Sequence, residues 1–504
     1  MTEPRQKMDD FEIAAELMRL CNAAPAATTR PTLAATPSDA ARWPTDMGNA
    51  QRLVSAFGKD IRYCPQFGQW LIWDGNRWRR DDVVQIVAIA KQVARTIYSQ
   101  AWDNASDDQA AAVKWALKSQ ARERLAAMVD LAKCEVPVRA DALDADPMLF
   151  AVSNGTIDLK SGTLRPARRE DLITLTAPVE FHPDAECPKW LAYLDLFMHG
   201  DAELIAYLQR IAGASLTADI RDQAMFVFYG TGSNGKSTFV DTMLHLLGGY
   251  AGSAPPGLPT LRKGSTEHPT EIADLKGKRL IVASEGDQGG KLNVPTVKRL
   301  TGDSRLKARF MREDYFEFER TFKILYSSNH KPRVAEQTHA IWRRLKLVPF
   351  GITIEKSAEI KDYWVHLRDA GEWPGILAWA VRGCLAWQRD GLGEPAQVTA
   401  ATAEYRIEQD TLGEFFEQKC IIDPRAKVTR ALLYSAYEAW AQAAHERFWL
   451  KKRDFFERIR GRLDVHEAQD RHEGHVTRFF FGIGLSDNTY EQSDLSFDDT
   501  VAEL

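Results

Sequence analysis

Residues 230–237 read GTGSNGKS and fit the G-x-x-x-x-G-K-[S/T] pattern of a phosphate-binding loop. An apolar run at 225–229 precedes the loop, and apolar residues at helical spacing follow it as far as Gly248. A buried strand that ends in a glycine-rich turn and opens a helix presents backbone N–H groups to a polyphosphate. The pattern therefore predicts an ATP site rather than a structural glycine turn. Its predicted contacts are Gly230, Thr231, Gly232, Ser233, Asn234, Gly235, Lys236, Ser237 and Thr238.

Polar side chains that could complete a hydrolytic site lie in and after this loop. In loops of this pattern the lysine reaches the β- and γ-phosphates and the next hydroxyl coordinates Mg²⁺, so we expect these roles for Lys236 and Ser237. Residues 279–285 form a second apolar run that ends in Glu285, and Asp287 lies two residues further on. A carboxylate at the tip of a strand can contact the metal's water shell and polarise the attacking water. We expect Glu285 in this role, with Asp287 as a second acid; the alternative is a solvated strand end.

An asparagine and a pair of arginines come next in the chain. The apolar run at 322–326 leads to Asn329, which could orient the attacking water or contact the γ-phosphate; the alternative is an Asx turn before Pro332. Arg343 and Arg344 follow. Paired arginines are usually surface charges, but an arginine that reaches the ATP of a neighbouring subunit gives the same pattern.

Five stretches, in their order and near their spacing, resemble the superfamily 3 helicases, and specifically the phage and plasmid primase–helicase family typified by satellite-phage replication proteins. They are GTGSNGKSTF, RLIVASEGD, KRLTGDSRLKARF, KILYSSNHKP and AIWRRLKLVPF, and the likeness extends over residues 44–485. The resemblance implies an α/β fold with a P-loop AAA+-like motor. It also implies an ATP-dependent replicative DNA helicase that moves on single-stranded or forked DNA as a ring of identical subunits, usually a hexamer. Arg344, or as second choice Arg343, would act on the ATP of the neighbouring subunit.

The sequence departs from that family in two places. His339 stands a few positions before the arginine pair, where the family often has an acidic residue. This difference puts an ion pair at that place in doubt, but it leaves the expected coupling to the nucleotide intact. Full-length relatives also carry an N-terminal primase–polymerase domain with paired catalytic acids, whereas here Asp144 and Asp146 fall in a predicted polar loop. We therefore expect a helicase without primase chemistry, which relies on a separate primase or other replication proteins. The alternative is a bifunctional primase–helicase.

Two basic segments are predicted to contact DNA. Residues 298–312 hold six basic side chains and one acid, and in the resembling helicases this interval carries a hairpin that grips the DNA backbone. A helical pattern at 431–446, a basic helix at 451–462 and a strand at 476–483 resemble the family's C-terminal winged helix. The alternatives are a solvated charged face and a module for subunit contacts. The predicted contacts are Lys298, Lys307, Arg309 and Arg312, and then Lys451, Lys452, Arg458 and Arg460.

Composition agrees with a soluble, multidomain intracellular protein, and the resemblance to phage and plasmid proteins implies the cytoplasm of a bacterial host. The chain has 504 residues, a net charge of −5 and 44% hydrophobic residues, and its six cysteines include no C-x-x-C pair. No apolar stretch has the length that a membrane span requires. We expect a flexible segment at 1–43, a mixed α/β domain at 44–188, the ATPase domain at 189–390, a linker within 388–402, the winged-helix domain at 403–485 and an acidic tail at 486–504.

Two other classes of protein are rivals to a helicase. A P-loop kinase would turn over ATP without stimulation by DNA. A nucleotide-gated origin-binding protein would act through its C-terminal domain. An ATPase assay with and without single-stranded DNA distinguishes the three functions.

Overall fold

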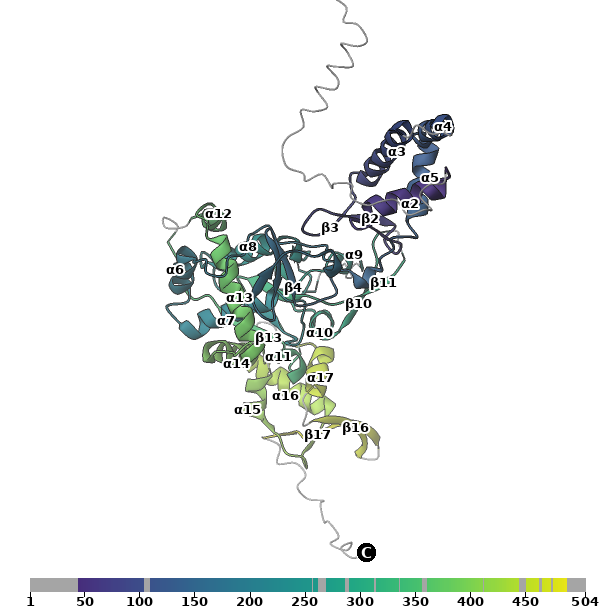
Figure 1. Cartoon of the computed structure of the whole chain (residues 1–504). Coiled ribbons are helices and arrows are strands. Elements are labelled where there is room, and N and C mark those ends of the chain that lie inside the picture. The colour runs from purple at the N-terminus through teal and green to yellow at the C-terminus, as the bar shows by residue number, and fades with distance from the viewer. Residues whose placement is uncertain are drawn as a thin grey trace, which may run out of the picture. The chain divides into compact units, whose positions relative to one another are not determined.

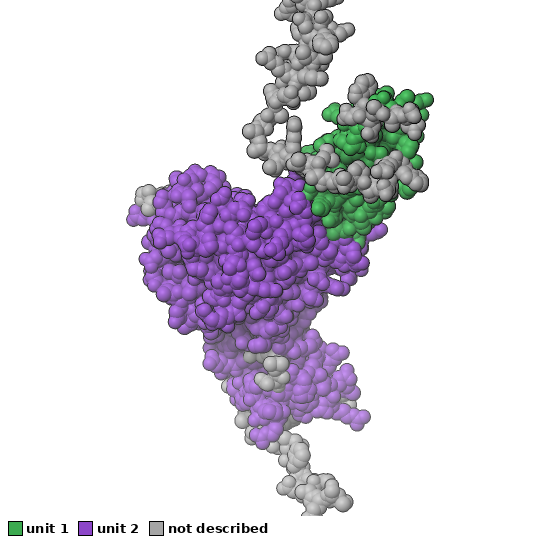
Figure 2. Space-filling view, viewed as in Figure 1, with its two compact units in different colours: residues 1–70, 81–138 green, residues 71–80, 139–504 purple. Residues whose placement is uncertain are grey.

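The computed structural model describes residues 44–103, 109–255, 257–261, 269–285, 290–311, 314–334, 336–355, 360–410, 412–443, 450–461, 465–472 and 475–486. The chain divides into two compact units, Met1–Trp70 with Asp81–Val138 and Leu71–Arg80 with Arg139–Leu504 (Figure 2). The expected segment at 1–43, the expected acidic tail beyond Ser486, and the predicted site residues Asp287 and Arg312 lie outside the described residues. The domain boundaries expected within the second unit stay a prediction.

Helices dominate the first unit. Thr45 caps the first of them, because its Oγ1 accepts a hydrogen bond from the Gly48 N–H at 3.0 Å. Apolar side chains that recur at helical spacing, among them Leu53 and Met128, meet in its core. The elements are α2 (Asp46–Phe57), β1 (Ile61–Cys64), α3 (Gln85–Asp103), α4 (Gln109–Ser119) and α5 (Arg122–Ala132) (Figure 1).

The second unit begins with short antiparallel strands. Phe150 of these strands shares a hydrophobic core with Phe226 of the motor sheet. Asp144 Oδ1 accepts from the Thr174 N–H at 2.7 Å and Asp146 Oδ1 from the Met148 N–H at 2.8 Å, so both carboxylates serve the backbone, as in the predicted polar loop. The elements are β2 (Gln69–Trp73), β3 (Trp78–Arg80), η2 (Ala140–Ala142), β4 (Leu149–Val152), β5 (Gly155–Asp158), β6 (Thr163–Arg165) and η3 (Arg169–Asp171).

A five-stranded parallel sheet forms the centre of the second unit, in the order β13-β7-β12-β9-β8. Its strands are nearly continuous apolar runs, as expected of a parallel sheet covered on both faces. The three predicted strands are confirmed, with small shifts at their ends. The strands are β7 (Met225–Tyr229), β8 (Ala251–Ser253), β9 (Leu280–Ser284), β12 (Lys323–Ser328) and β13 (Leu345–Pro349).

Helices cover this sheet. The predicted helix after the phosphate loop is confirmed, and it ends at Gly248, whose φ of 51° lies in the left-handed region. Two long helices, α7 and α13, touch closely at Gly213, where a Cβ would lie 2.1 Å from the Cys384 nitrogen. The helices are α6 (Pro188–Phe197), α7 (Ala202–Ser215), α8 (Lys236–Leu247), η4 (Gly248–Tyr250), α9 (Pro269–Ala273), α12 (Tyr363–Asp369) and α13 (Trp373–Asp390).

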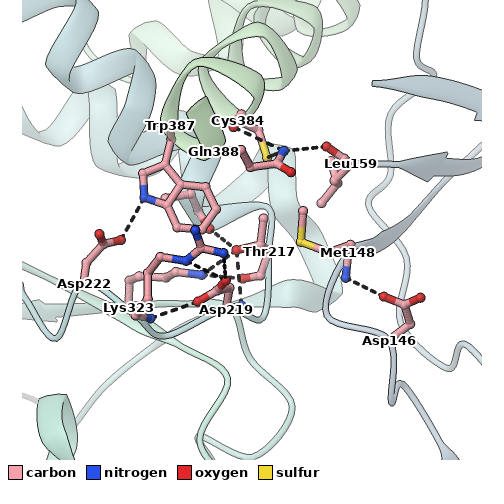
Figure 3. A network of polar contacts seen from close by, with 12 residues as sticks. Asp146, Met148, Leu159, Thr217, Asp219, Asp222, Lys323, Cys384, Trp387 and Gln388 are labelled. Atoms are coloured by element: carbon pink, nitrogen blue, oxygen red, sulfur yellow. Dashed lines mark hydrogen bonds and ion pairs between the residues drawn. The ribbon is translucent and has the colours of Figure 1, made fainter. Parts of the chain in front are cut away.

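A buried polar network lies around the start of β12 (Figure 3). Lys323 donates to the Thr217 carbonyl oxygen at 2.5 Å and to Thr217 Oγ1 at 2.9 Å. Trp387 Nε1 donates to Asp222 Oδ2 at 3.0 Å, and Gln388 Nε2 donates to the Leu159 carbonyl at 2.7 Å. Burial first, and then the charge of Arg279, lower the pKa of Lys323 to about 7. The network joins α13 to the motor sheet and to the strand region that precedes the motor.

The linker expected within 388–402 is wrong for most of its length. The helix α13 continues to Asp390, and α14 (Ala396–Gln409) begins just after Pro395. Its side chains at 398, 402 and 405 lie on one helical face against β13, and Tyr405 is fully buried. Thr402 Oγ1 accepts from the N–H of Leu347 in β13, which is the edge strand of the sheet, at 3.1 Å. The glycine and proline residues mark only a short connection between two packed helices.

The charged segment after β9 forms a helix and then a hairpin. The hairpin strands β10 (Arg305–Ala308) and β11 (Phe316–Glu319) pair antiparallel. They follow α10 (Val294–Gly302), and α11 (His339–Trp342) precedes β13. The hairpin inferred from the family resemblance is thus present, although Lys298 lies on α10 rather than in it.

The C-terminal module contains the predicted basic helix and strand. Its core is aromatic and includes Phe415, Tyr437 and Phe455. A three-stranded sheet has the order β15-β17-β16, and β14 pairs with β18. The elements are α15 (Gly413–Lys419), β14 (Cys420–Ile421), β15 (Lys427–Thr429), α16 (Arg430–Ala443), α17 (Lys452–Arg460), β16 (His466–His472), β17 (His475–Phe481) and β18 (Gly484–Leu485). Across the parts of the chain that the structure describes, no helix is both long and apolar enough for a membrane span.

Candidate nucleotide-binding site

The phosphate loop connects β7 to α8 and packs against α6. Gly235 has a φ of 82°, and a Cβ there would lie 2.8 Å from the ring of Phe197. The hydroxyl of Tyr193 donates to the Gly235 carbonyl at 2.7 Å. Burial raises the pKa of Tyr193, so this hydroxyl stays protonated as a donor. Tyr193 and Phe197, two aromatic side chains of α6 that the sequence analysis did not identify, therefore pack against the loop at Gly235.

The loop is also tied to the chain that follows β13. The buried Asn234 donates from Nδ2 to the Phe350 carbonyl at 3.3 Å, and the Ile354 N–H donates to the Ser233 carbonyl at 2.9 Å. A Cβ on Gly230 would lie 2.4 Å from the backbone carbonyl oxygen of Phe350, so a larger residue would force the backbone to shift. Thr231 is exposed, and Ser237 is exposed in the first turn of α8 beside the half-buried Thr238. The loop is thereby held with its Ser237 hydroxyl open to solvent.

Lys236 is buried, and its ammonium group is held by three oxygens. Nζ donates to the Gly230 carbonyl at 2.6 Å, to Asn234 Oδ1 at 2.9 Å and to Asn329 Oδ1 at 3.1 Å. Burial lowers the pKa of Lys236 to about 8, and the charge of Glu285 opposes this shift. A phosphate oxygen would compete for the same donor hydrogens. The contact with Asn329 brings together two predicted residues that are 93 positions apart.

Glu285 lies at the end of β9, beside the end of β12. Its Oε2 accepts from Ser328 Oγ at 2.9 Å and from the Asn329 N–H at 3.0 Å. Its Oε1 lies 3.3 Å from Nδ1 of His330. The parallel register that places Ser284 opposite Ser327 explains why these groups meet. The predicted residues Lys236, Glu285 and Asn329 thus gather at one edge of the sheet, where strands of an open α/β sheet end and ligands bind.

These residues fit a magnesium–triphosphate. The turn at residues 230–235 exposes backbone N–H groups to a phosphate, and Lys236 supplies the adjacent positive charge. Ser237 and Glu285 offer the hard oxygen ligands that Mg²⁺ prefers. Asp287 lies outside the described residues, so its part in the site stays a prediction.

The two predicted arginines differ in their surroundings. Arg343 is exposed, and its Nη2 donates to Gln223 Oε1 at 3.0 Å. Arg344 is half-buried: it donates to the Ala340 carbonyl, and its Nε is buried without a partner among the described residues. Burial, followed by the charge of Arg343, lowers the pKa of Arg344. Arg344 therefore packs against its own chain, whereas Arg343 faces solvent.

The loop that follows Asn329 is clamped by α14. Lys331 Nζ lies 2.8 Å from both carboxylate oxygens of Glu408. The Tyr405 hydroxyl donates to the Pro332 carbonyl, and the Val334 N–H donates to Gln409 Oε1 at 2.9 Å. The helix that leads into the C-terminal module therefore contacts the loop that carries the asparagine of the site.

Two of the predicted DNA contacts, Lys307 and Arg309, lie close to the exposed aromatic ring of Tyr315. Lys307 Nζ lies 5.3 Å and the Arg309 guanidinium 5.0 Å from the centre of the Tyr315 ring, which is 52% exposed. Lys298 instead pairs with Glu336 at 2.6 Å. Arg312 lies outside the described residues. Exposed cations beside an aromatic ring form a surface that suits the backbone and bases of a single strand.

The four predicted basic residues of the C-terminal module are not equivalent. Lys451 and Lys452 are exposed at the start of α17. Arg458 is half-buried, and burial lowers its pKa. Arg460 Nε lies 2.6 Å from Glu467 Oε2. The two lysines are therefore better exposed for a phosphate than the two arginines.

Comparison with known proteins gives two matching family models. The model described as "D5 N terminal like" matches residues 50–199, and "Family of unknown function (DUF5906)" matches residues 228–344. The second match contains the phosphate loop from Gly230 on, together with Glu285, Asn329 and both arginines.

Several viral proteins are similar to the chain. It is 25% identical over 391 residues to "Putative helicase 022R" of Frog virus 3 (isolate Goorha), which covers 61% of this chain and 40% of the viral protein. It is 25% identical over 292 residues to "Putative helicase L207/L206" of Acanthamoeba polyphaga mimivirus, covering 54% and 30%, respectively. It is also 25% identical over 343 residues to "Putative helicase 184R" of Invertebrate iridescent virus 6. This alignment covers 60% of this chain and 35% of the viral protein. The chain spans less than half the length of these relatives.

One solved structure, described as "The A form apo structure of NrS-1 C terminal region-CTR", aligns with 84% of this chain and 96% of its own, at 12% identity and a TM-score of 0.44.

From the family models and the viral relatives, the chain contains a D5 N terminal like region and a DUF5906 region, and it is distantly homologous to viral proteins named as helicases.

Proposed function

We propose that this protein is an ATP-dependent DNA helicase of superfamily 3, which moves on single-stranded DNA as a ring, usually a hexamer, in the replication of a phage or mobile element. The proposal depends above all on one observation: Lys236, Asn329 and Glu285 meet at one edge of a parallel sheet, with Lys236 Nζ 3.1 Å from Asn329 Oδ1. The viral relatives named as helicases support it further.

In the proposed reaction the loop N–H groups and Lys236 bind the phosphates of ATP. Ser237 and Glu285 would hold Mg²⁺, which supplies positive charge to the phosphate oxygens. Glu285 polarises the attacking water, with Asp287 as a second acid, and Asn329 detects the γ-phosphate. The hydrogen bonds from Ser328 and Asn329 hold one oxygen of Glu285 in place beside the phosphate loop.

An arginine from the neighbouring subunit would complete the site. The expectation from family resemblance preferred Arg344 over Arg343. Both arginines would have to give up a contact within their own chain, Arg343 with Gln223 and Arg344 with Ala340. The exposed position of Arg343 supports the reverse order, because Arg344 is half-buried and its Nε is enclosed.

DNA would be gripped by the hairpin of β10 and β11 through Lys307, Arg309 and Arg312. The C-terminal module, in the proposed role of a winged helix, would add duplex contacts through Lys451 and Lys452. Those lysines also support a second candidate, a nucleotide-gated origin-binding protein. A bifunctional primase–helicase and a partner primase remain alternatives for primer synthesis.

The test is ATP hydrolysis by purified protein with and without single-stranded DNA, with a mass measurement and strand displacement on a fork. We expect stimulation by DNA, assembly, and loss of hydrolysis in Lys236→Ala. Hydrolysis that DNA does not change would favour a kinase-like enzyme. DNA binding without any hydrolysis would favour the origin-binding function.

A further inference from the structure

His330 lies beside the carboxylate that we assign to water activation. Its Nδ1 is 3.3 Å from Glu285 Oε1, while the other oxygen of the same carboxylate accepts from Ser328 Oγ at 2.9 Å and from the Asn329 N–H at 3.0 Å. Glu285 is 16% exposed and His330 is 50% exposed. Three consecutive residues of one turn therefore contact the two oxygens of Glu285, Ser328 and Asn329 by hydrogen bonds and His330 at ion-pair distance.

The contact with His330 differs from the other two in what it fixes. Ser328 and Asn329 anchor a single oxygen, and a carboxylate anchored at one oxygen can still rotate about its terminal bond. A donor at the second oxygen fixes the plane of the group.

The backbone of His330 is held by the neighbouring Ser328. The His330 N–H donates to Ser328 Oγ at 3.1 Å, and the Ser328 hydroxyl also contacts the His330 carbonyl. Asn329, between these two residues, contacts Lys236 through its side chain at 3.1 Å. The turn 328–330 thus links the phosphate-binding lysine to the carboxylate.

We propose that His330 is a positioning residue of the hydrolytic site: its Nδ1–H orients the carboxylate of Glu285 for the attacking water. This inference rests on the proposed ATPase. In this role His330 acts through Glu285. An imidazole that orients a catalytic carboxylate should affect turnover, and it should leave ATP binding to the phosphate loop.

The experiment compares His330→Ala, which removes the donor, with His330→Asn, whose side-chain amide presents an N–H at a comparable distance from the backbone. We expect His330→Ala to lower kcat about tenfold, the lower end of what such supporting groups contribute. KM and the affinity for a fluorescent ATP analogue should change less than twofold. His330→Asn should recover most of kcat. The matched control is His182→Ala, which breaks another histidine–carboxylate pair, with Glu180 at 3.0 Å, and should leave all three values unchanged.

A second pair of variants shows whether His330 acts through Glu285. In a Glu285→Ala background, His330→Ala should cause no further loss of kcat, because residues that act as one unit are not additive. An unchanged or increased kcat in His330→Ala would overturn the inference, and so would an equal loss of affinity or an absence of recovery in His330→Asn. If the wild-type protein hydrolyses no ATP, the proposed function fails as well; an active wild type with an active His330→Ala refutes the inference alone.

Discussion

The ammonium group of Lys331 lies 2.8 Å from both carboxylate oxygens of Glu408, and so connects the loop after Asn329 to α14. This helix ends at Gln409, and the C-terminal module starts with α15 at Gly413. The ion pair is therefore a short physical path between the proposed ATP site and a proposed DNA-binding module.

Glu408→Gln should weaken this path. We expect the stimulation of ATPase by DNA to fall several-fold while the rate without DNA stays within twofold. The pair is partly exposed, so stability should fall by no more than about 1 kcal/mol. Glu404→Gln, an exposed acid on the same helix, is the control. Equal stimulation in both variants would show that the ion pair carries no signal.

Arg343→Ala should abolish ATPase in assembled protein and leave ATP affinity nearly unchanged, because this arginine would act on the neighbouring subunit's ATP. Mixing Lys236→Ala with Arg343→Ala subunits should restore part of the activity, since some interfaces then have both groups intact. Parallel mixing with Arg344→Ala tests the other arginine. No recovery in either mixture, under conditions where the subunits assemble, would contradict action between subunits.

Lys307→Ala should weaken binding to single-stranded DNA and lower its dependence on salt. Removing one lysine–phosphate interaction should reduce the slope of log K against log salt by about 0.7. Anisotropy titrations of a labelled oligonucleotide at several salt concentrations measure this slope. Lys298→Ala is an informative comparison, because Lys298 is paired with Glu336 and should leave the slope unchanged. If both variants lower the slope equally, the charged segment acts as a diffuse positive face.

Lys323 should make stability depend on pH. Its pKa is about 7 in the fold, whereas its ordinary value is 10.5. Between these values the unfolded chain binds more protons than the folded chain, so the contribution of Lys323 to stability rises with pH and is lowest below pH 7.

Melting curves of wild type and Lys323→Met between pH 7 and pH 9 test this sign, since the window starts at the folded pKa of about 7. The Tm of the wild type relative to the variant should increase across the window. A constant difference would mean that Lys323 keeps its charge when buried.

Strands and the phosphate loop were predictable because their signals are local. The runs at 225–229 and 322–326 are apolar and bounded by polar residues, and the loop has a fixed spacing. The contact between Glu285 and His330 was not predictable, because it depends on the register of β9 against β12. The support of Gly235 by Tyr193 likewise joins residues distant in the chain.

The position of α14 and the surroundings of the two arginines also differ from what the sequence suggested, for different physical reasons. The helix α14 has few large apolar residues and follows a glycine and proline cluster, so its sequence resembled a linker. Arg343 and Arg344 lie in the turn between α11 and β13, where Arg343 is exposed and Arg344 is half-buried, so identical side chains have different surroundings.

The hydrogen bond from Leu347 to Thr402 has a practical consequence for anyone who produces this motor in isolation. An uncovered edge strand is a template for pairing with other chains. A recombinant protein truncated at residue 390 would lack the helix that shields this flank, and it should precipitate or self-associate on purification. Extending the expressed segment through Gln409 retains the natural cover.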